Sequence, residues 1–170
     1  MSQLTLSIPP LDVYLIIPLV LLGQLHRWIS RQGALLLVVS NLPITIAHEL
    51  AHFLVALILG GRPTGISLWP QRSRNGWTLG SVTSHATILS ATPTALAPLL
   101  WLPAGVGLLM NRAALSGGSV GALCGIYLAV YCCLAASVPS WQDIKVAATH
   151  PVSLLVWSGI AWGLWHLVMA

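Results

Sequence analysis

Apolar residues in this chain gather into long runs that are separated by short polar segments. A run of about 20 apolar residues is the length that an α-helix needs to cross a bilayer. The pattern therefore predicts an all-α membrane protein, a multi-pass bundle of about five or six transmembrane helices. We expect the first run to be retained as a span, because no basic segment precedes it. The runs cover residues 11–25, 33–59, 86–110, 120–138 and 151–168.

Glycines mark the end of the second run. It stops at Gly60 and Gly61, and a polar stretch with several further glycines follows at residues 62–84. Glycine pairs of this kind stop helices and favour turns. Two short pieces of the polar stretch, residues 65–69 and 77–79, have the aromatic and β-branched residues typical of strands. We predict that these two pieces pair as a small β-hairpin after the second span.

Prolines interrupt the later runs. A proline inside a helix removes a backbone hydrogen bond and clashes with the preceding turn, so we predict a kinked or broken helix over residues 86–110. Pro139 ends the fourth run, and Ser140 can then cap a short helix that holds Asp143 in its first turn. The prolines of the third run are Pro93, Pro98 and Pro103.

The composition supports a membrane location. Hydrophobic residues make up 56% of the 170 residues and charged residues 6%, with a mean hydropathy of +0.86, whereas soluble domains carry about 25% charged residues. We expect one integral membrane domain over residues 1–170, surrounded by the lipid bilayer and without a separate soluble domain. The scattered basic residues flank the runs, so the net charge of +4 does not indicate a nucleic-acid partner. The eight tryptophans are typical of an interfacial belt.

Acidic side chains are rarer still. The chain has three of them, Asp12, Glu49 and Asp143. An ionised carboxylate inside a spanning helix costs about 2.5 to 3.5 kcal/mol on insertion scales, so an acid in such a place is a candidate functional group. Asp12 is close enough to the amino terminus to lie at the membrane interface. Glu49 lies inside the second run and therefore points to a function.

The second run contains the sequence His48-Glu49-Leu50-Ala51-His52. Residues four apart share one face of an α-helix, so His48 and His52 can bind one metal ion while Glu49 reaches a water bound to it. Two imidazoles and a carboxylate suit zinc, and Glu49 could act as the general base of peptide hydrolysis. With six histidines and one glutamate, the motif is expected by chance only roughly 0.001 times. The alternative is a polar contact in which the histidines only hydrogen-bond between helices.

A catalytic zinc ion needs a third protein ligand. Asp143 is the remaining acid besides the remote Asp12. Zinc with Asp143 and Glu49 both ionised carries no net charge, whereas the two carboxylates alone would repel each other. Asp143 could instead be only a capping or interfacial acid. His85 and His150 are the alternative third ligands.

These features together resemble the site-2 protease family of intramembrane zinc metalloproteases, the peptidase M50-like proteins. The resemblance covers roughly residues 35–147. It implies that His48, His52 and Asp143 bind one zinc ion per chain, and that Glu49 is the general base. It also implies that the substrates are membrane-spanning segments of other proteins. The features are the Ala47-His48-Glu49-Leu50-Ala51-His52 run, the Gly60-Gly61 stop, the segment Ser90-Ala91-Thr92-Pro93-Thr94 and the residues from Pro139 to Asp143.

Smaller roles and rival functions remain open from the residues alone. His85, just before the third run, could contact the substrate or the developing oxyanion. The edge of the predicted hairpin could align an extended substrate by strand addition. One rival is a catalytically silent metal-binding membrane protein. Another is a transporter component in which the same polar residues line a path through the membrane. The pattern indicates neither an orientation nor an oligomeric state.

Overall fold

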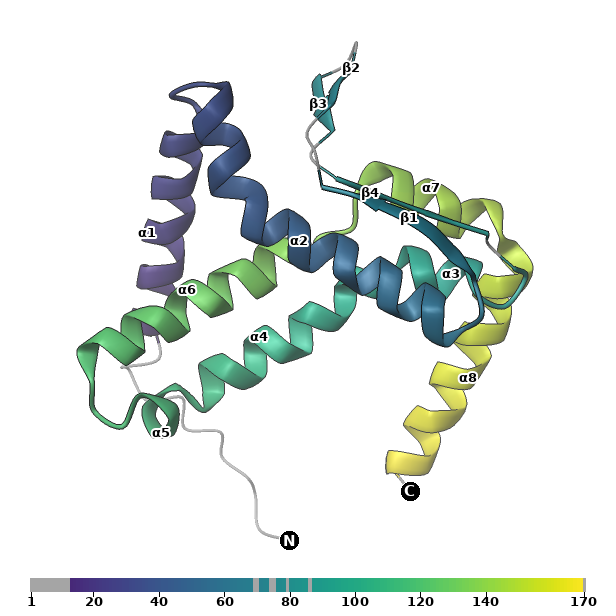
Figure 1. The fold of residues 1–170 in the computed structure, drawn as a ribbon. Coiled ribbons are helices and arrows are strands. Elements are labelled where there is room, and N and C mark those ends of the chain that lie inside the picture. Colours follow the sequence, from purple (N-terminus) through teal and green to yellow (C-terminus); the bar gives the residue numbers. More distant parts are fainter. Residues whose placement is uncertain (1–12, 69–70, 74–75, 79, 86, 170) are drawn as a thin grey trace, which may run out of the picture.

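The computed structural model describes residues 13–68, 71–73, 76–78, 80–85 and 87–169 (Figure 1). This part of the chain is mainly helical with short antiparallel strands. The strands are β1 (Pro63–Ser67), β2 (Gln71–Ser73), β3 (Gly76–Thr78) and β4 (Ser81–Ser84). The helices are α1 (Val13–Ser30), α2 (Ala34–Ile58), α3 (Ala91–Ala95), the 3-10 helix η2 (Ala97–Leu100), α4 (Trp101–Met110), α5 (Arg112–Ser116), α6 (Val120–Ala136), α7 (Trp141–Thr149) and α8 (Pro151–Met169).

Glycine marks the end of α2, and prolines mark the breaks in the third apolar run. α2 ends just before Gly60, whose φ of 69° is a left-handed conformation that glycine adopts easily. The third apolar run is broken into three short helices rather than forming one long one. Pro93 lies in α3, Pro98 in η2 and Pro103 in α4, so each piece contains one of the prolines. The predicted interruption of the third run is confirmed.

Only part of the predicted membrane bundle follows from helix length and hydropathy. Among the described residues, α2 is the one helix that is long and apolar enough to cross a membrane by itself. α6 and α7 meet the same test as a pair, although they are bent by 46° relative to each other. Shorter apolar helices cover Leu15–Ser30 and Ala97–Met110. The five or six spans stay a prediction.

The predicted pairing within the polar loop is wrong in its register. β1 pairs with β4, with Ile66 opposite Val82, while β2 pairs with β3, with Arg72 opposite Trp77. Both ladders are antiparallel, and the β2–β3 pair lies between β1 and β4 in the sequence. Residues 65–67 therefore pair with residues 81–83 and not with residues 77–79. Trp69 and Leu79, which were part of the predicted pair, lie outside the described residues.

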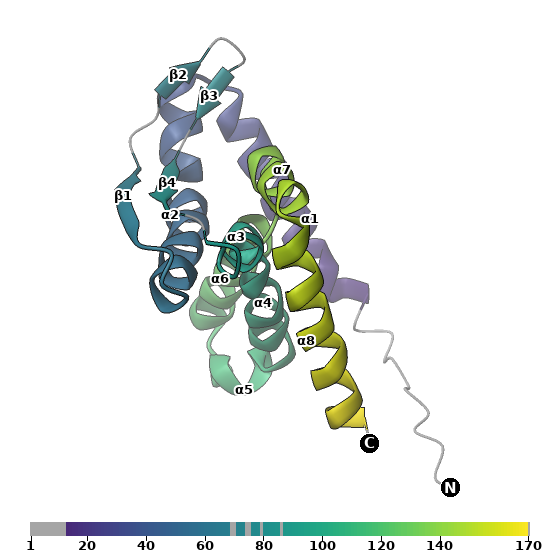
Figure 2. The same cartoon turned by 90° about the vertical axis from the view of Figure 1, so that its right-hand side faces the viewer.

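The helices pack as two neighbouring groups that meet at α2. α1 and α2 lie side by side, and α4 runs along α6, while α7 packs on α3 and α8 (Figure 1 and Figure 2). α2 contacts α6, η2, α3 and the β1–β4 pair, so it is central to the fold. At Gly105 in α4, an added Cβ would lie 3.1 Å from the Cβ of Cys133 in α6. Glycine there permits the close approach of the two helices.

Small and polar residues fill the interior, while large apolar residues cover the outside. The largest fully buried side chains among the described residues are Val130, Pro98, Ser90 and Ser153. In a soluble protein the buried positions are taken mainly by large aliphatic and aromatic residues. Here such residues are exposed, and on α2 alone they include Leu35, Leu36, Val39, Leu42, Ile46, Leu50, Leu54, Leu57 and Ile58.

Candidate metal centre

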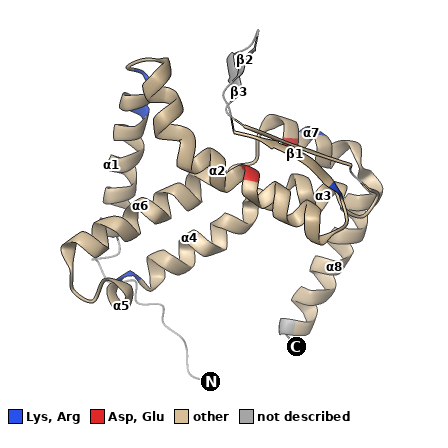
Figure 3. Cartoon of the chain, in the orientation of Figure 1, with Lys and Arg blue, Asp and Glu red and all other residues tan. Residues whose placement is uncertain are grey.

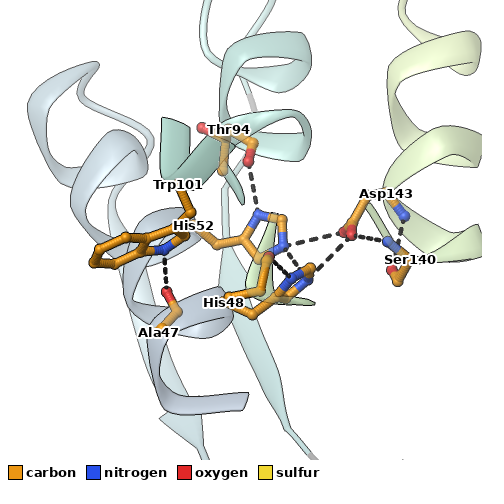
Figure 4. Close-up of polar contacts among 8 residues, drawn as sticks. Ala47, His48, His52, Thr94, Trp101, Ser140 and Asp143 are labelled. Carbon is orange, nitrogen blue, oxygen red and sulfur yellow. Dashed lines mark hydrogen bonds and ion pairs between the residues drawn. The ribbon is translucent and has the colours of Figure 1, made fainter. Parts of the chain in front are cut away.

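α2 carries the first two candidate ligands on one face. His48 and His52 are one helical turn apart, and both side chains point toward Asp143 at the start of α7 (Figure 4). His52 is 7% exposed and Glu49 is 8% exposed, so polar groups of this helix are enclosed by protein. The acidic side chains of the described residues are Glu49 and Asp143, on α2 and α7 (Figure 3).

Asp143 is held by a reciprocal cap at the start of α7. The Ser140 hydroxyl accepts a hydrogen bond from the backbone N–H of Asp143 at 3.2 Å, and Asp143 Oδ2 accepts one from the backbone N–H of Ser140 at 2.6 Å. The predicted capping role of Ser140 is therefore confirmed, as a capping box. Asp143 is both a capping residue and a member of the cluster.

Potential ligand atoms of three residues come together at this point (Figure 4). His48 Nε2 and His52 Nε2 are 3.2 Å apart. Asp143 Oδ2 lies 3.3 Å from His48 Nε2, and Asp143 Oδ1 lies 3.2 Å from His52 Nε2. These residues form the one group of three or more His, Cys, Asp or Glu side chains, within the described ranges, that could hold a metal ion.

Backbone carbonyls bind the other nitrogen of each imidazole. His48 Nδ1 donates to the carbonyl oxygen of Ala136 at 2.9 Å, and His52 Nδ1 donates to that of Thr94 at 2.7 Å. In a regular helix these oxygens would accept from the N–H groups of residues 140 and 98. Pro98 has no N–H, and the N–H of Ser140 donates to Asp143 instead. Pro98 therefore leaves the Thr94 carbonyl free for His52, and the end of α6 leaves the Ala136 carbonyl free for His48.

This hydrogen bonding fixes the tautomer of both histidines. A carbonyl oxygen can only accept, so Nδ1 of each ring carries the proton and Nε2 of the neutral ring has a free lone pair. Two lone pairs and a carboxylate then face one another within 3.3 Å. Neutral rings direct their lone pairs at the carboxylate, and protonated rings would place two positive charges side by side. One divalent cation between the three groups would remove either repulsion, so the donor set fits a metal ion.

Trp101 stabilises the helix segment that carries the motif. Its indole Nε1 donates a hydrogen bond to the carbonyl oxygen of Ala47 at 2.8 Å, directly before His48 (Figure 4). Its N–H thus has a partner inside the fold, and its predicted place in a belt of interfacial tryptophans stays a prediction. Trp141, in contrast, is 78% exposed.

The other candidate residues lie apart from the cluster. His85 follows β4 and is exposed, and its proposed contact with a substrate stays a prediction. His150 Nδ1 donates to the carbonyl oxygen of Val146 within the last turn of α7. Neither histidine belongs to the ligand group, so the structure favours Asp143 among the three alternatives.

Sequence reasoning missed the groups that surround the ligands. The carbonyls of Thr94 and Ala136 and the indole of Trp101 have no sequence motif of their own. Two prolines were a partial signal for the free carbonyls. Pro98 cannot donate to the carbonyl four positions earlier, and Pro139 stands just beyond the end of α6.

Comparisons with known proteins add no assignment. The chain matches no protein-family model, no curated protein and no solved structure. The geometry of the cluster and the residues around it are therefore the basis for a functional proposal.

Proposed function

We propose that this protein is a membrane-embedded zinc metalloprotease, in which His48, His52 and Asp143 bind one zinc ion and Glu49 is the general base. The observation that carries the proposal is the convergence of two imidazole nitrogens and a carboxylate, whose ligand atoms all lie within 4.8 Å of one another. Such a set leaves a fourth position for water, as catalytic zinc sites require.

The chemistry of the ligand atoms supports zinc. Imidazole nitrogens and a carboxylate oxygen are ligands that zinc takes in catalytic sites, whereas Mg²⁺ prefers oxygen ligands. One ligand atom from each of the three residues lies within 4.8 Å of the other two. The two imidazole nitrogens reach different oxygens of the Asp143 carboxylate, at 3.3 and 3.2 Å.

Each residue has a distinct part in the proposed reaction. Zinc, when bound, lowers the pKa of a coordinated water toward neutral pH and polarises the substrate carbonyl. The Glu49 carboxylate then accepts a proton from the attacking water and passes it to the amine that leaves. The carbonyls of Ala136 and Thr94 orient the two imidazoles through their Nδ1 protons. No covalent intermediate with the protein is needed.

The distribution of residues supports a membrane location. Only 11% of the residues in the most apolar stretch of α2 are buried, whereas a core helix of a soluble protein would be mostly buried. Exposed tryptophans also stand at helix ends, with Trp28 near the end of α1 and Trp141 at the start of α7. We extend the proposal to α1, α6 and α8 as further spans, and to the broken run of α3, η2 and α4. On α8 the exposed apolar residues include Val152, Leu154, Leu155, Ile160, Trp162, Leu164, Trp165 and Leu167.

The proposed substrates are membrane-spanning segments of other proteins, because the proposed active site lies among helices with a lipid-facing surface. The two rivals, a silent metal-binding protein and a transporter component, place different demands on Glu49. A structural or regulatory metal site needs no carboxylate beside an open coordination position. A transport path needs no zinc. Hydrolysis needs both zinc and a carboxylate beside its open position, so removing the metal and replacing Glu49 test the proposal separately.

Metal removal is expected to abolish cleavage reversibly. The purified full-length chain in detergent is tested on a library of quenched fluorescent peptides, each with about 20 apolar residues flanked by lysines. Dialysis against a chelator should stop cleavage of the best peptide, and one equivalent of zinc should restore it, because the water is not acidified without the ion. Calcium is the matched control and should restore nothing. Cleavage that persists in the metal-free protein would contradict the proposal.

A further inference from the structure

Gly80 lies directly against the proposed general base. It precedes β4, and a Cβ built on it would be 2.8 Å from Glu49 Cγ, 3.0 Å from Glu49 Oε1 and 2.7 Å from Thr45 Cγ2. Real Cβ atoms essentially never come within 3.0 Å of another heavy atom in this way. Thr45 and Glu49 are one turn apart on α2, so the backbone at Gly80 rests on a single face of that helix.

Space, and not backbone conformation, explains the glycine at this position. The glycines with positive φ among the described residues are Gly33, Gly60, Gly117 and Gly118, and Gly80 is not one of them. A left-handed φ is therefore not the reason for a glycine at this position. What an alanine lacks is room, because its methyl group would occupy the volume of the Glu49 side chain.

We propose that Gly80 is a positioning residue that holds the Glu49 carboxylate in its working place. This inference rests on the proposed function of Glu49 as a general base. The backbone before β4 packs over the Glu49 side chain, which is 8% exposed, and so restricts where the carboxylate can go. A base must be placed within hydrogen-bond reach of the water it deprotonates. The strand pair thus acts on catalysis through Glu49 without binding the metal itself.

The sheet provides a matched control for this inference. Gly65 lies in the partner strand β1, opposite Thr83 of β4, and also has no positive φ. A Cβ built on Gly65 meets nothing within 4 Å. Gly65→Ala, within β1, and Gly80→Ala, directly before β4, therefore make the same chemical change, and only Gly80→Ala introduces a collision with Glu49.

The test compares kcat, KM and zinc content of the two full-length variants, using the best-cleaved peptide of the apolar library. To restore an ordinary contact of about 3.4 Å, Glu49 must move by several tenths of an ångström, and misplacement by about 1 Å can cost a hundredfold in rate. We expect Gly80→Ala to lose between about tenfold and a hundredfold in kcat while its zinc content is unchanged. Gly65→Ala should match the parent in all three quantities.

A second variant separates displacement of Glu49 from a general loosening of the strands. Thr45→Ser removes Cγ2, the atom nearest to the added methyl group, but leaves the collision with Glu49. The double variant Thr45→Ser/Gly80→Ala should therefore remain impaired in kcat. Recovery of the parental kcat in the double variant, or no loss in Gly80→Ala, overturns the inference alone. Failure of the parent chain to cleave any peptide overturns the proposed function and this inference with it.

Discussion

Glu49→Gln is expected to retain its zinc ion and to lose cleavage of apolar peptides by a factor of about 10² to 10⁴, the usual contribution of a general base. Glutamine has the shape of glutamate but cannot accept the proton of the attacking water. Glu49 is not a member of the ligand group, so the metal site should survive the change. The measurement is kcat on the best-cleaved peptide, with zinc per chain determined on the same sample.

The matched control for this variant is His166→Ala. His166 lies in α8, is exposed and meets the ring of Trp162 edge to face, and it is not a member of the metal cluster. It should keep both zinc and activity. A Glu49→Gln protein that cleaves as fast as the parent would exclude the proposed mechanism, even with zinc fully bound.

Asp143→Ala is expected to lose the metal ion. The change removes the carboxylate that faces both Nε2 atoms at 3.2 and 3.3 Å, leaving two protein ligands where catalytic zinc needs three. The affinity for zinc should fall by more than the roughly 10- to 100-fold that loss of an outer hydrogen bond typically costs. Competition with a chelator of known affinity measures the change.

Ser140→Ala controls for the capping role of Asp143. It removes the hydroxyl that caps α7, but leaves the Asp143 carboxylate and its bond from the Ser140 backbone N–H. Loss of an N-cap side chain costs about 1 kcal/mol of stability, which should leave the metal site in place. If Ser140→Ala loses zinc as completely as Asp143→Ala, then Asp143 acts on the site by capping the helix and not as a ligand.

Local signals in the sequence were sufficient to predict the candidate ligand cluster. The spacing of His48 and His52 fixes their common face once α2 is a helix, because helical periodicity does not depend on the rest of the fold. The capping contact of Ser140 with Asp143 could be predicted for the same reason, because a capping box involves only residues that are close in the sequence. Pro93, Pro98 and Pro103 predicted the broken third run for the same local reason.

Long-range contacts were not encoded in any local signal. The carbonyl oxygens of Thr94 and Ala136 are chemically like every other carbonyl, and only the packing of α3 and α6 against α2 brings them to the histidines. The register of β1 with β4 depends on where the hairpin turns, which a short glycine-rich stretch specifies weakly. Gly80 was visible only as a loop breaker, because its contact with Glu49 joins residues far apart in the sequence.

The most direct test of the central claim is zinc K-edge X-ray absorption of the purified full-length protein. We expect one zinc ion with two imidazole nitrogens at about 2.0 to 2.1 Å and oxygen ligands at about 2.0 to 2.2 Å. One imidazole or none would contradict it, because His48 and His52 must both bind. A sulfur ligand at about 2.3 Å would also contradict it, since zinc would then lie on Cys124, Cys132 or Cys133.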